Sequence, residues 1–401
     1  MVDPKTFYRE LDGMLSTIGK GRSDKNFFVT ILNELEQKFG DTLHIRDSHI
    51  FEQRGDDFVF LNTSTRRQDS KIARKIPVGA EVIQHVLKHG LVVYDTPGLF
   101  QDFDLKLDTE KMTPAVILVH NPVRKWLLVF ELEKGSAREE ILLFLNAMRT
   151  ALNYRLFSEM MKSDLRKAEQ IQKSLLPKMA PKIAGYEIYG YSQAAEVVGG
   201  DFYDYFQFEE QDFGCCIGDA SGHGIPAALL VRDVVIGLRM GLAQEMRLIH
   251  TLKKLNKVIQ QSTYSTNFVS LFIGEIESDG HLFYVNAGHP PPFVVSGNRI
   301  TDLEATGITL GFMPDIELRR SYIHMKPGSV LMLYSDGIVE RQESEDEQFM
   351  VHRLKELVAE NRHKSAEEIV KQVFDVVFNF GKRKSWEDDA TLVVIKRTSG
   401  G

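Results

Sequence analysis

The stretch Ile217-Gly218-Asp219-Ala220-Ser221-Gly222-His223-Gly224 lies between a strand-like apolar run at 213–217 and a helical pattern at 227–242. It puts an aspartate among small residues at the point where the strand pattern ends. An aspartate that ends a buried strand is costly to desolvate unless a cation neutralises it. The glycines beside it let the backbone turn sharply and let a phosphate come close. Alone, such a stretch is more often an ordinary turn than a functional site.

Three further segments share this feature, an aspartate beside a glycine or a second acid at the edge of a strand pattern. They are Gly199-Gly200-Asp201-Phe202-Tyr203-Asp204, Tyr334-Ser335-Asp336-Gly337 and Glu387-Asp388-Asp389-Ala390-Thr391. Clustered carboxylates suit hard divalent ions such as Mg²⁺ or Mn²⁺. The four segments together therefore predict a metal site in the second half of the chain.

The sequence around these segments alternates between strand and helix patterns. Strand-like runs, some joined by short turns, predict antiparallel sheets; they lie at 213–217, 268–276, 281–286, 293–295, 330–334 and 391–396. Helical patterns lie between them at 227–242, 248–261 and 366–378. This arrangement favours a layered sandwich with the helices outside.

From about Gln170 to Lys396 the chain resembles the sporulation-type (SpoIIE and RsbU) branch of the type-2C protein serine/threonine phosphatases. The resemblance runs through six ordered motifs, namely Ile171-Gln172-Lys173-Ser174-Leu175-Leu176-Pro177, GGDFYD at 199–204, DASGHG at 219–224, Asn286-Ala287-Gly288-His289-Pro290, and the two segments around Asp336 and Asp388. It implies an α-β-β-α sandwich with a two-metal site at one edge of the central sheets.

The resemblance also implies a role for each carboxylate. Asp219 would bridge two Mn²⁺ or Mg²⁺ ions and the Ala220 carbonyl would be a further ligand. The remaining ligands would come from Asp201, Asp336 and Asp388, with Asp204 and Asp389 as candidates for the same shell. Two such ions would lower the pKa of a bridging water and neutralise charge on the phosphoryl group of a phosphoserine or phosphothreonine ester.

Some positions depart from the family pattern. Eukaryotic type-2C enzymes place a histidine two residues beyond the bridging aspartate as a proposed general acid, and Ser221 stands there instead. His223 is interpreted either as a proton-transfer group or, with more support, as a residue that orients the loop before the helix. His289, followed by three prolines, is typical of a turn histidine bonded to backbone rather than a ligand. The identity of any general acid and of a phosphate-binding arginine therefore stays open.

Two rival interpretations are weighed against this one. The string Gly199-Gly200-Asp201-Phe202 invites comparison with the GGDEF signature of diguanylate cyclases, but the glutamate of that signature is absent here and the other motifs go unexplained. The second rival is a degenerate phosphatase that only binds a partner. Every carboxylate position is filled, which favours a working enzyme, and turnover with Mn²⁺ separates the two.

The pattern of helices and strands in residues 1–150 predicts a separate α+β sensor module. Two helical patterns lie between Phe7 and Phe39, and the second begins at Asp24. Strand-like runs follow at 44–52, 58–62, 91–94, 115–120 and 126–132, with a helix at 80–88 and a hairpin turn at Arg54-Gly55-Asp56-Asp57. The element order resembles a GAF-type domain, whose ligand or partner the sequence leaves unknown.

Residues 151–180 predict a helical linker between this module and a phosphatase domain at 181–398. The helical pattern runs from Ala137 to Leu176 and stops at Pro177 and Pro181. Apolar residues follow heptad spacing at Phe157, Met161, Ala168, Ile171 and Leu175. Two interpretations stay open: an amphipathic helix packed on its own domain, or a parallel coiled coil that joins a homodimer.

The length, composition and charge of the chain limit the classes of protein to which it could belong. The 401 residues favour two domains, and 43% apolar with 26% charged residues is typical of a soluble globular protein. The net charge of −7 gives no support to nucleic-acid binding. The chain has two cysteines, Cys215 and Cys216, which are adjacent, so a disulfide between them would be strained and is not expected. Free cysteines of this kind fit a cytoplasmic location. No signal-peptide pattern and no apolar stretch of the ~20 residues that span a bilayer is found.

The sequence therefore predicts a metal-dependent protein serine/threonine phosphatase of bacterial signalling, controlled by its N-terminal sensor. By resemblance, the partner would be a serine-phosphorylated anti-sigma-factor antagonist or a similar regulator.

Overall fold

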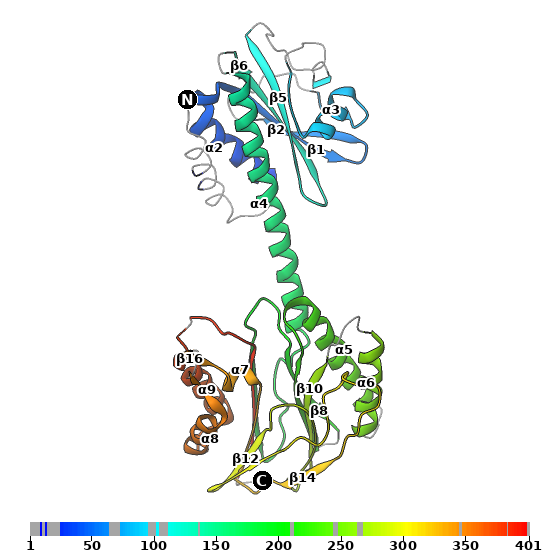
Figure 1. The fold of residues 1–401 in the computed structure, drawn as a ribbon, viewed down its shortest axis with the longest axis vertical. Coiled ribbons are helices and arrows are strands. Elements are labelled where there is room, and N and C mark those ends of the chain that lie inside the picture. Colours follow the sequence, from blue (N-terminus) through cyan, green and yellow to red (C-terminus); the bar gives the residue numbers. More distant parts are fainter. Residues whose placement is uncertain are drawn as a thin grey trace. The chain divides into compact units, whose positions relative to one another are not determined.

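The computed structural model describes residues 9, 13, 25–63, 73–94, 102–103, 111–134, 137–208, 212–243, 248–262, 268–344, 347–382 and 384–398. The chain divides into two compact units, Met1–Asp164 and Leu165–Gly401 (Figure 1). The first helical pattern, from Phe7, and the expected start of the second at Asp24 lie outside the described residues.

The first unit contains a six-stranded antiparallel sheet with the order β3-β2-β1-β6-β5-β4. Its strands are β1 (Ile45–Arg54), β2 (Asp57–Thr63), β3 (Lys75–Pro77), β4 (Leu91–Val93), β5 (Met112–His120) and β6 (Lys125–Glu133). The predicted hairpin is confirmed, because Arg54 pairs with Asp57 across the turn from β1 to β2.

Each face of this sheet carries its own apolar core. On one face pack α2 (Lys25–Leu43) and the first half of α4 (Arg138–Lys173), and the predicted apolar face of the second helix is buried there through Phe28, Ile31, Leu32, Leu35 and Phe39. The other face packs against α3 (Glu81–His89). The likeness to a GAF-type domain stays a prediction.

The second unit contains two five-stranded antiparallel sheets. The first has the order β14-β11-β10-β9-β8, from β8 (Asp201–Gln207), β9 (Phe213–Ala220), β10 (Val269–Ile276), β11 (His281–Ala287) and β14 (Ser321–His324). The second has the order β13-β12-β15-β18-β7, from β7 (Tyr186–Gln193), β12 (Phe293–Ser296), β13 (Arg299–Asp302), β15 (Val330–Tyr334) and β18 (Ala390–Arg397). A short hairpin of β16 (Gln342–Ser344) and β17 (Glu347–Gln348) stands apart from both.

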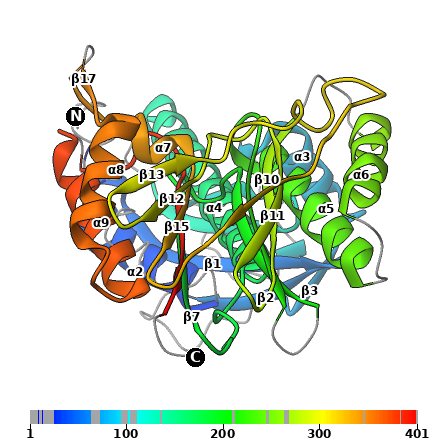
Figure 2. The same ribbon diagram turned by 90° about the horizontal axis from the view of Figure 1, so that it is seen from below.

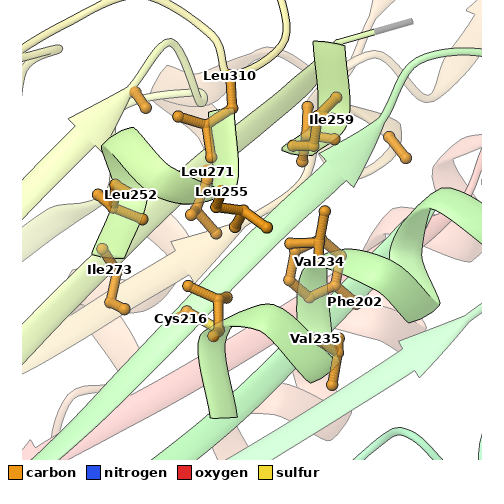
Figure 3. Close-up of a cluster of buried hydrophobic side chains, with 14 of the residues drawn as sticks. Phe202, Cys216, Val234, Val235, Leu252, Leu255, Ile259, Leu271, Ile273 and Leu310 are labelled. Carbon is orange, nitrogen blue, oxygen red and sulfur yellow. The ribbon is translucent and has the colours of Figure 1, made fainter. Parts of the chain in front are cut away.

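Three apolar cores order these sheets into four layers. One core, with Phe272 of β10 and Leu331 of β15, lies between the two sheets. The outer face of the first sheet is covered by α5 (Gly224–Ala243) and α6 (Leu248–Ser262) (Figures 2 and 3). The outer face of the second is covered by α8 (Met350–Asn361) and α9 (Ala366–Phe380) (Figure 2). The predicted α-β-β-α sandwich is therefore confirmed.

The two adjacent cysteines show that successive side chains of one strand enter different cores. Cys215 lies in the core between the sheets, whereas Cys216 lies under α5 and α6 on the opposite face of β9. Both are free thiols, and burial raises the pKa of the Cys215 thiol to about 12. Neither is therefore suited to act as a nucleophile.

Most of the predicted linker pattern lies in α4, which has 36 residues, but the helix ends at Lys173, before Leu175 and the predicted end at Leu176. Its first half is buried in the first unit, whereas Phe157, Met161 and Ile171 are exposed. The division between the units falls inside this helix, after Asp164. Within the described ranges, no helix combines the length and the hydropathy that crossing a membrane requires.

Candidate metal-binding site

Two of the predicted aspartates come from neighbouring strands of the first sheet. Asp201 begins β8 and pairs in register with Asp219, near the end of β9. Gly200 lets them approach, because a Cβ atom at that position would lie 2.6 Å from the Ala220 carbonyl oxygen and 2.9 Å from Asp219 Oδ1. The Ala220 amide donates a 3.0 Å hydrogen bond to the Gly200 carbonyl, which fixes the Asp219–Ala220 segment beside Asp201.

The other two predicted aspartates flank neighbouring strands of the second sheet. Asp336 begins the short helix α7 (Asp336–Val339) just after β15, and Asp388 lies just before β18. Because β15 and β18 are antiparallel, the end of one and the start of the other lie at the same edge. Gly337 is needed where the two segments pack, since any side chain there would overlap the Asp389 carbonyl oxygen.

The four carboxylates lie at one edge of the sandwich, where the charge of one raises the pKa of another. Burial, together with the charges of Asp336 and Asp388, raises the pKa of Asp219 to about 8. Burial and then the charge of Asp219 raise the pKa of Asp201. The pKa of Asp336 is raised by burial and then by Asp388. We call Asp201, Asp219, Asp336 and Asp388 the carboxylate edge.

One buried oxygen of the carboxylate edge is available to a divalent cation. Within the part of the chain that the structure describes, Asp201 Oδ2 is a buried oxygen with no hydrogen-bond partner. Among the described residues, no three of these carboxylates bring an oxygen each within 4.8 Å of one another, so the side chains as they stand do not form a closed ligand shell around one ion. Hard divalent ions prefer such oxygen donors, and they would relieve the repulsion that raises the pKa of Asp219.

Asp389 has a different environment from the other acids. Its Oδ1 accepts a 2.8 Å hydrogen bond from the Ala195 amide, and its Oδ2 accepts from the amides of Gly200 (2.6 Å) and Asp201 (3.4 Å). Both oxygens thus hold the loop that leads into β8. This geometry gives Asp389 an anchoring role, and the ligand role that the family resemblance implied for it stays a prediction.

Asp204, the other additional candidate, is also engaged elsewhere. Its Oδ2 accepts a 2.7 Å bond from Arg239 Nε of α5, and Arg239 Nη2 donates at 2.6 Å to the Leu175 carbonyl, just beyond the end of α4. The ion pair therefore ties β8 to α5 and to the residues that follow α4.

The candidate proton-transfer residues lie in structural contacts or in solvent. Ser221 exchanges hydrogen bonds with the backbone of Phe268. The exposed His223 side chain lies 3.4 Å from Glu196.

His289 is fully buried beneath the carboxylate edge, and burial lowers its pKa to about 3. Its Nδ1 lies 2.9 Å from Ser270 Oγ, and its Nε2 lies 3.1 Å from the Tyr334 carbonyl oxygen. Ser270 pairs with Asp219 in the sheet, and Tyr334 precedes the Asp336 segment. The neutral ring thus links the two sheets, in keeping with the predicted bond to backbone.

Arg341 is a residue whose role sequence reasoning missed. Its side chain is fully buried, contacts the Glu387 carboxylate and donates at 2.6 Å to the Ser385 carbonyl. The guanidinium also lies about 5 Å from the ring centroids of Phe378 (5.2 Å) and Trp386 (5.1 Å). Arg341 therefore connects the segment after Asp336 with the loop before Asp388.

Replacing Arg341 with lysine is expected to weaken metal activation. Lysine keeps the charge but loses the planar fork that bonds two partners at once. Supporting contacts of this kind are typically worth about 10- to 100-fold in metal affinity or activity. We expect the half-saturating Mn²⁺ concentration to rise by about 10-fold, measured as turnover per folded molecule.

The matched control is Arg319→Lys, because Arg319 is exposed and, among the described residues, its side chain pairs with Glu317 at 4.0 Å. Equal Mn²⁺ requirements in the wild type and in the folded fraction of Arg341→Lys would contradict a positioning role for Arg341.

Comparisons with known proteins agree with this geometry. Residues 209–398 match the family described as Stage II sporulation protein E (SpoIIE). The chain is 31% identical over 241 residues to the phosphoserine phosphatase RsbU of Bacillus subtilis, which covers 59% of this chain and 70% of RsbU. It is 28% identical over 187 residues to the phosphoserine phosphatase RsbP of the same organism, which covers 45% of this chain and 46% of RsbP.

Among solved structures, the PP2C domain of SiaA from Pseudomonas aeruginosa matches with a TM-score of 0.54 at 16% identity. The match covers 60% of this chain and 98% of the SiaA domain. At this identity the match supports the fold alone.

The layer order is that of the PP2C-type fold, and the similarity to RsbU and RsbP defines the chain as a protein serine/threonine phosphatase. The chain belongs to the SpoIIE family of these enzymes.

Proposed function

We propose that the carboxylate edge holds two divalent cations, Mn²⁺ or Mg²⁺, with Asp219 between them and the Ala220 carbonyl as a further ligand. The observation that carries this proposal is the placement of Asp219, which pairs with Asp201 and lies near enough to Asp336 and Asp388 for their charges, after burial, to raise its pKa to about 8. A cluster that repels its own charge at neutral pH suits a cation. Bound divalent ions supply an activated water and neutralise charge on the transferred phosphoryl group.

The residues around the edge then have positioning roles in this proposal. Asp389 holds the loop that carries Gly200 and Asp201 through backbone amides. His289 stays neutral and links the strand ends that carry Asp219 and Asp336. We propose no protein nucleophile, since an activated water suffices for this reaction.

We further propose that the substrate is a phosphoserine or phosphothreonine of a folded regulatory protein, such as an anti-sigma-factor antagonist. The similarity to RsbU and RsbP, both named phosphoserine phosphatases, supports the phosphoserine part. A shallow metal site at a sheet edge also lacks the deep apolar pocket that an aromatic ester would favour.

Treating phosphorylated candidate antagonists with the purified chain and Mn²⁺ tests this function. Phosphate release should be fast from phosphoserine and phosphothreonine proteins, slow from matched phosphotyrosine proteins, and absent after chelation. Comparable rates on all three esters would contradict the proposed substrate class, and binding without turnover would indicate a degenerate phosphatase.

We also propose that the first unit is a GAF-like sensor that controls the carboxylate edge through α4. The end of α4 contacts the site loop directly, because Gln172 donates from its side-chain amide to the Gly199 carbonyl and accepts a 3.0 Å bond from the Gly199 amide. A small cavity beside this contact is lined by Gln172, Asp201 and Asp389. A shift of α4 would therefore reach the loop that Asp389 holds.

Replacing Gln172 with alanine is expected to lower turnover by up to about 30-fold, because two hydrogen bonds of about 1 kcal/mol each no longer fix the Gly199 loop. The matched control is Lys173→Ala, since Lys173 is exposed and its ion pair in the described structure is with Glu169, one helical turn away. Turnover is measured at saturating Mn²⁺ with both variants shown to be folded. Equal turnover in Gln172→Ala and Lys173→Ala would remove this contact from the control proposal.

The exposed apolar residues of α4, Phe157, Met161 and Ile171, support the dimeric version of the linker. Leu175, by contrast, is partly buried and packs against the core under α5 and α6. We propose that the exposed residues pair with a second copy of α4. The substitution Ile171→Glu should then lower the molecular mass of the protein measured by light scattering, whereas an unchanged mass would favour a monomeric helix.

A further inference from the structure

A group of side chains of the types that bind metal ions belongs to the first unit, whereas the carboxylate edge belongs to the second. Asp47 and His49 belong to β1 and Glu131 belongs to the neighbouring strand β6. One donor atom from each of the three lies within 4.8 Å of the others, and His49 Nε2 lies 2.9 Å from Glu131 Oε1.

The pairing of the two strands holds this group together. Asp47 pairs directly with Glu131, and His49 pairs with Val129 two positions further along β1. Because side chains alternate along a strand, Asp47, His49 and Phe51 share one face. That face is the one covered by α3, where Phe51 and Val129 belong to the apolar core.

Burial distinguishes this group from ordinary surface acids. His49 is 0% exposed, Asp47 is 3% exposed, and the Glu131 side chain is 15% exposed. Asp47 Oδ1 accepts a 3.0 Å hydrogen bond from the Ser48 amide and Glu131 contacts His49, yet two carboxylates directly opposite each other in a sheet would repel one another if both were ionised. A cation held by both carboxylates converts this repulsion into attraction.

The donor set indicates the class of cation. One imidazole nitrogen and two carboxylate oxygens suit Zn²⁺ and similar first-row divalent ions, which bind histidine as well as oxygen donors. Mg²⁺ and Ca²⁺ prefer oxygen donors alone, as in the carboxylate edge.

We propose that the first unit binds one divalent transition-metal ion of the Zn²⁺ class through Asp47, His49 and Glu131. The site joins the two central strands of the sheet, β1 and β6. If the proposed control by the first unit holds, occupancy of this site is a signal that it reads. The binding itself stands without that control and without the phosphatase site.

Titrating the full chain with Zn²⁺ in excess Mg²⁺ tests the proposal by calorimetry. The wild type should bind one Zn²⁺ equivalent that His49→Gln and Asp47→Asn bind about 100-fold more weakly, because ligand loss costs at least as much as loss of a supporting contact. Asp219→Asn should keep this equivalent, which separates it from the carboxylate edge. Equal Zn²⁺ binding by the wild type and the folded His49→Gln variant would overturn the proposal.

A matched control comes from an exposed group of similar composition, Glu277, Asp279 and His281, on the hairpin between β10 and β11. His281→Gln should leave the Zn²⁺ equivalent unchanged.

A measurement on the wild type alone covers the case in which the variants fail to fold. X-ray absorption at the zinc edge, with one equivalent bound, should show one imidazole among oxygen donors. A shell with no imidazole, or with two, would overturn the assignment.

Discussion

Replacing Asp219 with asparagine is expected to reduce phosphatase turnover by on the order of 1,000-fold while the fold survives. Metal ions stabilise the charge of the transition state by several kcal/mol, and each 1.4 kcal/mol is about a factor of ten in rate. In the proposed site Asp219 lies between both ions, so its loss disturbs both. Asparagine keeps the shape of the side chain and removes only its charge.

The measurement is turnover on a phosphoserine protein as a function of Mn²⁺ concentration, with circular dichroism as the test of folding. Asp315→Asn is the matched control, because Asp315 is an exposed acid of the same unit. Turnover within a few-fold of the wild type in the folded Asp219 variant, or undiminished turnover in the chelated wild type, would refute the two-metal proposal.

The sequence predicted the layers of the second unit because its buried strands are continuous apolar runs. The run at 330–334 corresponds to β15 (Val330–Tyr334) without any shift. The sequence did not predict β7 (Tyr186–Gln193), which is half-buried at the edge of its sheet and carries polar residues at several positions. It also missed α8 (Met350–Asn361), of which only Leu354, Val358 and Asn361 are fully buried. Both elements gain their stability from packing that a local pattern does not report.

The carboxylate edge could be anticipated for a different reason. Each of its aspartates stands in a local motif next to a glycine or a second acid, and local motifs are visible in a single sequence. The contacts of Arg341 could not be anticipated from the sequence, since its partners Ser385 and Glu387 are 44 and 46 residues away along the chain. The same holds for Asp389, whose amide donor at Gly200 is 189 residues away. A residue type predicts a possible ligand, but only the fold decides which oxygens are already occupied.

The metal-free protein is expected to become less stable as the pH rises from 6.5 to 8, and Mg²⁺ or Mn²⁺ should remove this loss. The pKa of Asp219 is raised from 3.8 to about 8 in the folded chain. Between these values the folded state keeps a proton that the unfolded state has released, so the free energy of unfolding falls with increasing pH. For one such group the slope reaches about 1.4 kcal/mol per pH unit. The raised pKa of Asp201 and of Asp336 acts in the same direction.

His289 sets the lower limit of this pH window. Its pKa is lowered from 6.5 to about 3, so it makes the protein less stable as the pH falls below 6.5, opposite to the effect of Asp219. Denaturant unfolding should therefore be compared between pH 6.5 and 8. A Trp126→Phe background leaves Trp386, in the second unit, as the only tryptophan, so that its fluorescence reports on this unit.

With chelator present, the unfolding midpoint of this unit should fall across the window, and it should fall less in Asp219→Asn. With Mg²⁺ present, the midpoint should be higher and nearly independent of pH, because a bound cation keeps the carboxylates ionised and stabilises the folded state in proportion to its occupancy. A metal-free protein whose stability is flat between pH 6.5 and 8 would show that the carboxylates do not repel one another as their positions indicate. The case for a cation at this edge would then have to rest on turnover alone.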